Sequence, residues 1–217
     1  EREAARGHNL QTALDQLHAD VYKRSMAPFW AVDKSVAHDE DSQVKDKKKA
    51  VPFVWKYKRD IEPLLYRSAE LINTESSERR SLILVNPGLA PRRASVSTMY
   101  TAYRLNDPNE VMPPHRHSPN AIRFGLTGSL NFTGVEGENI TFGPGDMVLT
   151  PHDTWHNHGN QGDDPAINLS VLDLPLIKCR SSPDRKVGGM LFRGSLPAIA
   201  RKSHGTPLGP LADELHR

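Results

Sequence analysis

Apolar residues recur every three or four positions near the start of the chain. Leu10, Leu14 and Val21 lie on one side of a helix if residues 9–24 are helical. Asn9, at the start of this pattern, is a residue type that caps helix N-termini. We therefore expect an amphipathic helix whose apolar stripe packs against the outside of a β domain or against a partner subunit.

A second helical pattern follows Asp60, which stands in the position of an N-cap. Its apolar positions are Ile61, Leu64, Leu65, Ala69 and Ile72. The preceding residues, 51–57, bring large aromatic side chains together, and packing accounts for them. Residues 33–49 are charged and end in three lysines, which we interpret as a solvated linker rather than a nucleic-acid site.

Beyond these helices the pattern changes to short apolar runs separated by turn residues. The runs, each of which predicts a β-strand, are 82–85, 97–105, 147–151 and 166–174. Gly128 ends one segment, Val135–Glu138 has the composition of a hairpin turn, and Gly143–Asp146 has that of another. These three breaks divide residues 113–160 into four short strands, which we expect to follow one another as a meander.

These patterns divide the chain into three parts. Residues 1–50 hold the N-terminal helix and the charged linker, 51–177 form a mainly β domain, and 178–217 form a basic tail. The tail is rich in proline, glycine and serine and has no sustained periodicity, so we expect it to be poorly ordered.

Composition narrows the classes of function without selecting one. With 217 residues and 37% hydrophobic content, the chain can bury one domain core. A formal net charge of +2 does not predict binding to nucleic acid or to an anionic membrane. The single cysteine, Cys179, excludes an internal disulfide framework. Without a membrane-spanning run or a signal-peptide core, the expected location is the cytoplasm.

Histidines carry the strongest chemical signal. His115 and His117 are two residues apart, so on an extended strand their imidazoles point to the same side. A third imidazole, from His156 or His158, follows the run at 147–151. Three such ligands leave coordination positions open, as catalysis requires, whereas a closed structural zinc site usually needs cysteines. Histidines alone do not choose among Fe(II), Mn(II), Ni(II), Cu(II) and Zn(II).

Motifs around these histidines resemble those of the cupin family. Gly145, Pro151, His156 and Asn160 match its second motif at the family's intervals, with Asp153 where glycine is usual. His115, His117 and Gly128 match its first motif, although the usual glutamate ligand, which would fall near Ala121, is missing.

Three stretches narrow the resemblance to gentisate 1,2-dioxygenases. They are E-R-R-S-L-I-L-V-N-P-G-L (78–89), H-R-H-S-P-N-A-I-R-F (115–124) and W-H-N-H-G-N (155–160), and the similarity runs from Trp55 to Leu176. The resemblance implies a mainly β fold: a single cupin barrel (double-stranded β-helix, jelly roll) with N-terminal helices. Such enzymes usually carry two barrels, so the chain resembles their N-terminal half. We expect the apolar surface that a second barrel would cover to be exposed or used for self-association, giving a homo-oligomer.

The resemblance also assigns roles to individual residues. It implies that His115, His117 and His156 hold Fe(II) and that His158 acts as an acid or base toward the phenolic hydroxyl of the substrate. Arg123 would bind the substrate carboxylate, and it lies six residues after His117, on the same strand face if the pairing is unbroken. The alternatives are a structural role for His158 and a surface position for Arg123.

Three further residues are candidates for substrate binding. Arg79 matches an arginine that faces the family's substrate pocket, although paired arginines beside a strand are usually surface charges. Tyr100 and Arg104 are four residues apart on a predicted strand and so share a face. The family commonly has tryptophan and glutamine at these two positions. It also often has tryptophan and aspartate near Asn168 and Ser170, and these are absent here.

Two functions from different classes follow. The first is an Fe(II)-dependent dioxygenase that opens the ring of gentisate, or of a related hydroxybenzoate, with O2 to give maleylpyruvate. The alternative is a non-enzymatic cupin that binds an aromatic acid as a sensor or storage module.

Overall fold

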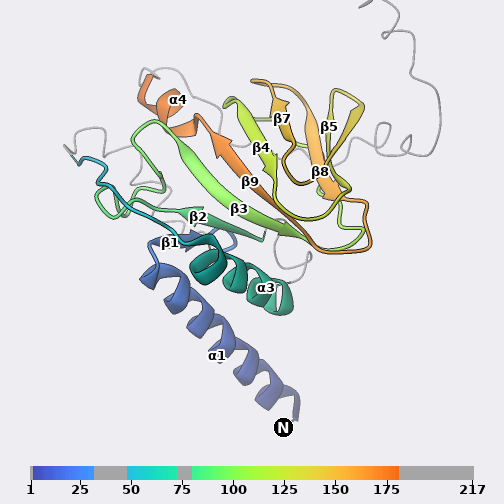
Figure 1. Ribbon diagram of the computed structural model, residues 1–217. Coiled ribbons are helices and arrows are strands. Elements are labelled where there is room, and N and C mark those ends of the chain that lie inside the picture. The colour runs from blue at the N-terminus through green and yellow to red at the C-terminus, as the bar shows by residue number, and fades with distance from the viewer. Residues whose placement is uncertain (1, 32–47, 73–79, 181–217) are drawn as a thin grey trace, which may run out of the picture.

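The computed structural model describes residues 2–31, 48–72 and 80–180 (Figure 1). Its helical elements are α1 (Arg2–Lys23), the π-helical turn η2 (Tyr57–Ile61), α3 (Glu62–Leu71) and α4 (Leu174–Arg180). Its strands are β1 (Met26–Pro28), β2 (Ser81–Leu84), β3 (Tyr100–Asn106), β4 (Ala121–Gly125), β5 (Asn131–Val135), β6 (Glu138–Phe142), β7 (Met147–Thr150), β8 (His156–Asn160) and β9 (Ala166–Leu172). Most of the predicted linker and tail lie outside the described residues.

The strands form two antiparallel sheets. One has six strands in the order β1-β2-β3-β9-β4-β7, and the other has three strands in the order β6-β5-β8. Within the ranges that the structure describes, these pairings leave two separate sheets rather than a closed barrel. The predicted mainly β architecture with N-terminal helices is confirmed.

The predicted meander is wrong. β4 pairs with β7 and β9 in the larger sheet, whereas β5 pairs with β6 and β8 in the smaller one. The chain leaves the larger sheet near Gly128, whose φ is +77° and where a Cβ atom would lie 2.5 Å from Cβ of Ala166. The hairpin predicted at Val135–Glu138 does join β5 to β6. The second turn, Gly143–Asp146, instead carries the chain from β6 back to β7 in the larger sheet. Turn residues encode where the chain reverses, but they do not encode which strands then pair.

The main hydrophobic core lies between the helices and the outer face of β2, β3 and β9. Its fully buried members include Leu17, Val21, Leu65, Leu82, Leu105 and Ile167. The apolar stripe of α1 therefore packs against the sheet at its C-terminal end, as predicted for the β domain. The N-terminal part of α1 extends away from the sheets (Figure 1).

Asp60 does not cap α3, contrary to the prediction. The helix begins at Glu62 after Ile61, and no side chain bonds to its first amides. Asp60 lies two residues before Glu62, inside η2, where its carboxylate accepts the backbone N–H of Lys56 at 3.1 Å and pairs with Arg59. The π-helical turn moves the N-cap and the helix start one residue beyond the expected position.

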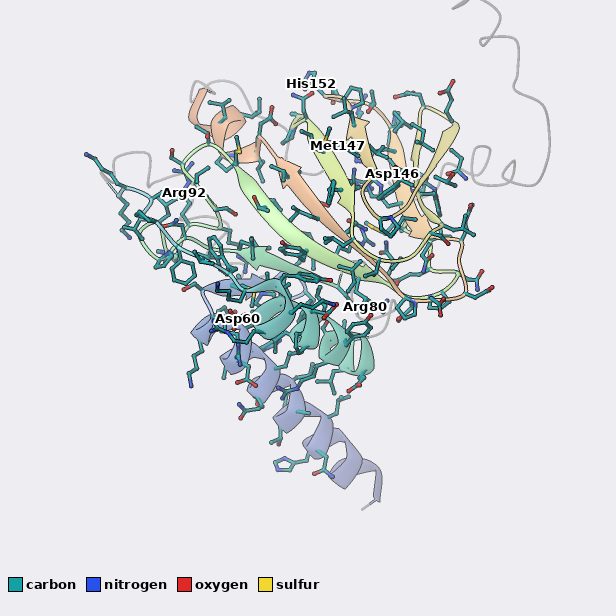
Figure 2. The ribbon with its side chains drawn as sticks, in the orientation of Figure 1. Asp60, Arg80, Arg92, Asp146, Met147 and His152 are labelled. Atoms are coloured by element: carbon teal, nitrogen blue, oxygen red, sulfur yellow. The ribbon has the colours of Figure 1, made fainter. Side chains whose placement is uncertain are left out.

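The outer face of the larger sheet is only half covered. α1 and α3 lie over β1, β2 and β3 (Figure 1), while β4 and β7 expose the alternate positions that point away from the interior. These positions carry Ile122, Phe124, Met147 and Leu149, of which Met147 (labelled in Figure 2) is 63% exposed. An apolar outer row of this kind is unusual for an antiparallel sheet that faces solvent. None of the described helices has the length and apolar character needed to cross a bilayer.

Candidate metal centre

Two segments that lie side by side supply four histidines. His156 and His158 are two residues apart on β8, so their side chains point to the same side of the strand. The segment that precedes β4 runs antiparallel to β8, and His115 and His156 exchange backbone hydrogen bonds of 2.8 and 2.9 Å. His117 follows two residues later. The H-x-H segment is therefore extended beside β8, as predicted, although it is not part of a regular strand.

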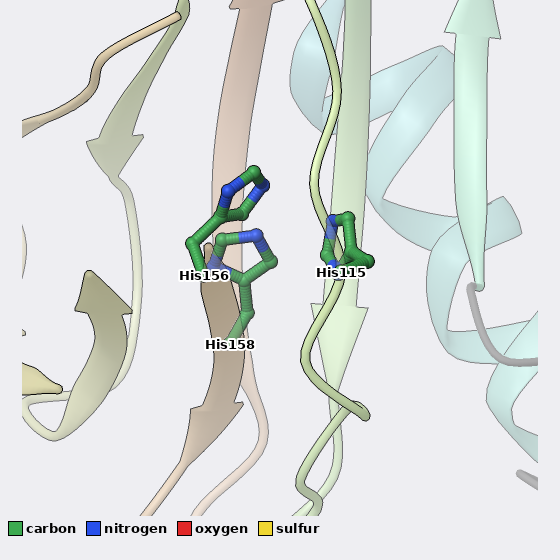
Figure 3. A group of neighbouring side chains, drawn as sticks. All are labelled: His115, His156 and His158. Atoms are coloured by element: carbon green, nitrogen blue, oxygen red, sulfur yellow. The ribbon is translucent and has the colours of Figure 1, made fainter. Parts of the chain in front are cut away.

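The four imidazoles form one buried cluster. Each is at most 5% exposed, and the ring centroids of His115 and His117 lie 4.3 and 4.5 Å from that of His156. The His158 ring centroid is 5.1 Å from that of His156. Figure 3 shows His156 and His158 on β8 facing His115 across the gap between the two segments.

Backbone carbonyl groups fix the tautomer of three of these rings. The Nδ1 atoms of His117 and His156 each lie 2.8 Å from a carbonyl oxygen two residues away, and that of His115 lies 3.2 Å from one. A carbonyl oxygen only accepts hydrogen bonds, so each Nδ1 carries a proton and donates it. The Nε2 atom of each ring then carries the lone pair that can bind a metal ion.

His158 is bonded differently. Nη2 of Arg123 lies 2.5 Å from Nε2 of His158, and Oγ1 of Thr133 lies 3.2 Å from its Nδ1. Because guanidinium only donates, Nε2 of His158 accepts and Nδ1 carries the proton. Burial, reinforced by the charge of Arg123, holds the pKa of His158 well below its usual value of 6.5, so the ring is neutral.

The distances between ring nitrogens and the hydrogen bonds of the rings favour different sets of three histidines as metal ligands. Ring nitrogens of His115, His156 and His158 lie within 4.8 Å of one another, which nominates His158. However, the lone pair of His158 is already taken by Arg123, whereas His117 directs its Nε2 at His156. Because a guanidinium already occupies the Nε2 lone pair of His158, the hydrogen bonds favour His117 over His158 as the third ligand.

The geometry of His117 and His156 fits a divalent ion. Their Nε2 atoms are 3.1 Å apart, and with both Nδ1 atoms protonated two lone pairs face each other. Two imidazole nitrogens bound at right angles, each about 2.1 Å from one ion, would be about 3.0 Å apart. The observed spacing therefore matches that of two neighbouring ligands of one metal ion.

Arg123 reaches the cluster from the opposite sheet. It lies on β4, is 7% exposed, and donates to Oγ1 of Thr150 on β7 at 2.8 Å as well as to His158. The expected route, an unbroken strand from His117, is wrong, because the chain turns at 118–120 and enters another sheet. Arg123 instead meets the histidines because the two sheets face each other.

The other residues predicted to bind substrate have different surroundings. Arg104 lies on the same face of the larger sheet as Arg123, is 5% exposed, and donates through Nε to Asn106 at 2.7 Å. Its charge also acts on His158. Tyr100, four residues earlier, packs on a small apolar cluster that includes Ile83. Arg79 lies outside the described residues.

The sequence patterns did not single out the two threonines of this site. Both are fully buried at inward positions of their strands. Thr133 on β5 bonds to His158, and Thr150 on β7 bonds to Arg123. A polar residue at an inward position of a strand was the available signal, but threonine is also a common strand residue.

Comparison with known proteins identifies the family of the β domain. Residues 105–172 match the family model of the Cupin domain. This part of the chain is a cupin domain. Over 127 residues the chain is 42% identical to a gentisate 1,2-dioxygenase of Ralstonia sp, covering 58% of this chain and 36% of the relative. Over 173 residues it is 37% identical to a 5-aminosalicylate 1,2-dioxygenase of Comamonas sp, covering 78% of this chain and 44% of the relative.

A solved structure shows the same fold. The salicylate 1,2-dioxygenase from Pseudoaminobacter salicylatoxidans, in adducts with gentisate, matches this cupin with a TM-score of 0.56 and 39% identity. The match covers 60% of this chain and 36% of that one. The predicted resemblance to gentisate 1,2-dioxygenases is confirmed. The chain spans less than half the length of the curated relatives it matches.

Proposed function

We propose that this cupin domain provides the metal centre of a dioxygenase that opens the ring of gentisate or of a related hydroxybenzoate. Its ligands are His115, His117 and His156, and its ion is Fe(II). The observation that carries the proposal is the pair of facing Nε2 atoms of His117 and His156, 3.1 Å apart, with both Nδ1 atoms bonded to carbonyl oxygens. The names of the relatives support the reaction type and the aromatic acid substrate.

The atoms and electrons of the reaction balance with its two substrates alone. Gentisate and O2 give maleylpyruvate, with both oxygen atoms inserted at the ring bond next to the carboxyl-bearing carbon, so no separate reductant is consumed. Fe(II) held by three histidines would supply open coordination positions and the redox chemistry that lets O2 react with an electron-rich ring. The protein groups around it bind and orient the aromatic acid.

Arg123 binds the substrate carboxylate. Its guanidinium is 7% exposed and is held by Thr150 beside the histidines. A planar guanidinium offers a carboxylate two parallel hydrogen bonds, which are strong where water is excluded. The same contact orients the ring with respect to the metal ligands.

His158 accepts the phenolic proton of the substrate. Without substrate, its Nε2 lone pair is occupied by Arg123. A carboxylate that takes the N–H groups of Arg123 competes with this contact and exposes the Nε2 lone pair beside the ring. The neutral state of His158 and its bond to Thr133 prepare it as a base. Arg104, Tyr100 and Arg79 make further contacts with the ring substituents.

Oxygen uptake by the full chain tests the proposal. The protein is loaded with Fe(II) under anaerobic conditions, its metal content is measured, and gentisate is added in air-saturated buffer. Stoichiometric iron and gentisate-dependent oxygen uptake are expected, with loss of both in His117→Ala. Bound iron and bound gentisate without oxygen uptake would favour the alternative, a cupin that binds an aromatic acid without turnover. Failure to bind a divalent metal would reject the proposed centre.

A further inference from the structure

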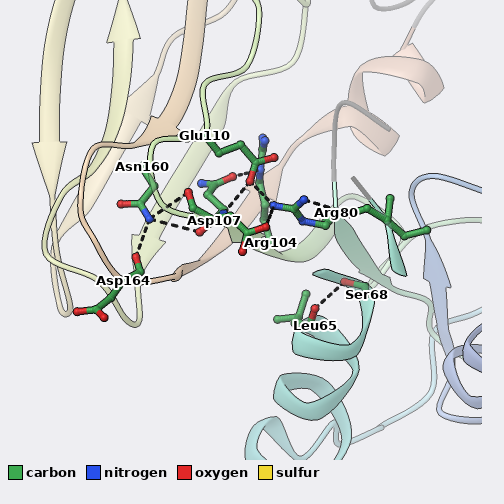
Figure 4. A network of polar contacts seen from close by, with 10 residues as sticks. Leu65, Ser68, Arg80, Arg104, Asp107, Glu110, Asn160 and Asp164 are labelled. Carbon is green, nitrogen blue, oxygen red and sulfur yellow. Dashed lines mark hydrogen bonds and ion pairs between the residues drawn. The ribbon is translucent and has the colours of Figure 1, made fainter. Parts of the chain in front are cut away.

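A buried ion pair next to the H-x-H segment has no part in the proposed reaction. Arg80 precedes β2 and Glu110 lies five residues before His115; their side chains are 3% and 6% exposed and in contact (Figure 4). The same guanidinium lies 2.8 Å from a carboxylate oxygen of Asp107 and donates to the carbonyl oxygen of Ile72 at 3.1 Å. One side chain thus joins the C-terminal end of α3 to the segment that leads to the metal ligands.

Stability alone does not account for this arrangement. Removing two charges from water costs free energy that their attraction only partly offsets, and apolar side chains of similar size are often as stable. Within the described part of the chain, Nε of Arg80 is also buried without a hydrogen-bond partner. The best-attested use of such buried charges is to fix one register among several.

The segment beside β8 needs its register fixed. Val111 pairs with Gly159, yet His115 pairs with His156, so four steps along one segment oppose three along β8. The segment therefore contains an extra residue, as in a β-bulge. Pro113 and Pro114 lie at this place and have no N–H group.

Few hydrogen bonds hold this irregular pairing. The N–H of Met112 bonds to the His158 carbonyl at 2.7 Å, and the N–H of His115 bonds to the His156 carbonyl at 2.8 Å. No N–H lies between these two donors, because both intervening residues are prolines. A slip of one residue would turn His115 and His117 away from the face on which His156 lies.

Glu110 is attached to β8 immediately before the bulge. Its carbonyl oxygen accepts the N–H of Asn160 at 2.9 Å, and its carboxylate accepts the N–H of Asp107 at 2.7 Å. The approach is close, since a Cβ atom at Gly159 would lie 2.3 Å from the Glu110 carbonyl oxygen. The carboxylate oxygen that accepts the Asp107 N–H also accepts an N–H of Arg80.

We propose that Arg80 and Glu110 are positioning residues for the metal centre. The ion pair fixes residues 110–117 in one register against β8, so that His115 and His117 present Nε2 to His156. This inference rests on the proposed metal site and adds two residues that touch neither metal nor substrate.

A charge-free double variant tests the proposal. Arg80→Met combined with Glu110→Gln removes both buried charges and leaves an acceptor for the Asp107 N–H. The matched control is Asp20→Asn combined with Arg67→Met, which removes a 2.7 Å ion pair between α1 and α3, away from β8. Urea unfolding reports stability, while titration with Co(II) reports affinity and the visible absorption of bound Co(II) reports ligand geometry.

We expect the Arg80/Glu110 double variant to fold and to bind Co(II) about 10- to 100-fold more weakly than wild type, with an altered spectrum. The control should keep the wild-type Co(II) affinity and spectrum whatever stability it loses. Wild-type affinity and spectrum in the Arg80/Glu110 variant would overturn the positioning role.

Two further results are informative. If wild type binds no Co(II), the proposed metal site itself is wrong, which is distinct from a failure of the ion pair alone. If the double variant does not fold, Arg80→Lys replaces it: lysine keeps the buried charge but cannot hold Ile72, Asp107 and Glu110 in the same way. Unchanged Co(II) binding in Arg80→Lys would then overturn the proposal.

Discussion

Replacing Arg123 by methionine should separate substrate capture from metal binding. Methionine keeps an apolar stem on β4 but removes the guanidinium that contacts His158 and Thr150. The guanidinium bonds to His158, which is not a proposed metal ligand, and to Thr150. Metal content should therefore stay at the wild-type level.

The size of the effect follows from the burial of Arg123. With the guanidinium 7% exposed, its contact with a substrate carboxylate is charge-assisted and largely shielded from water. Losing such a contact costs about 2–4 kcal/mol, which corresponds to a roughly 30- to 900-fold lower kcat/KM for a carboxylated ring. Hydroquinone, which is gentisate without its carboxylate, has no such contact to lose.

The assay is oxygen uptake at saturating Fe(II) with gentisate and with hydroquinone. Arg116→Met is the matched control, since Arg116 lies between two of the histidines but is 41% exposed and pairs only loosely with Asp153, at 3.6 Å. Its kcat/KM should equal that of wild type. An Arg123→Met enzyme that retains wild-type kcat/KM toward gentisate would refute the carboxylate-binding role.

Other parts of the molecule give three further tests. His117→Ala should lose bound metal whereas His158→Ala keeps it, as elemental analysis can check; equal loss in both would place His158 among the ligands. The hydrogen bond from Arg59 lowers the pKa of the Asp60 carboxyl below its usual 3.8, although burial acts in the opposite direction. Ionised Asp60 therefore stabilises the fold above that pH. This stability is lost as the pH falls through the folded-state pKa. Urea unfolding at about pH 6 and about pH 3 should show a smaller acid-dependent loss for Asp60→Asn than for wild type. Leu65→Ala, at a fully buried core position, should cost about 2–5 kcal/mol of unfolding free energy, and a loss under about 1 kcal/mol would contradict its core role.

The spacing of the histidines predicted which residues would meet. Alternation along an extended chain places His115 with His117 and His156 with His158, and short-range geometry is enough for that inference. It was not enough for Arg123, whose predicted route along one strand is broken. Its contact with His158 arises from the way two sheets face each other, which is a tertiary property.

Local signals were also overridden in the rest of the fold. Asp60 has the composition of a helix cap, but the neighbouring Arg59 and the extra turn of η2 give its carboxylate another role. The turns between β4 and β8 were located from glycine and proline. The strand pairs could not be predicted in the same way, because pairing within the two sheets depends on contacts between residues far apart in the sequence.

The proposed metal ligands and the proposed carboxylate anchor belong to opposite walls of the domain. All four histidines lie on or beside β8 of the smaller sheet, whereas Arg123 and Thr150 come from β4 and β7 of the larger one. Chemistry and substrate choice can therefore be altered separately. A substitution behind β4 or β7 would shift the anchor relative to the ion and change which ring is accepted, while the affinity for the ion stays as it was. Under the proposed function, this separation would give the domain a direct route to new aromatic substrates.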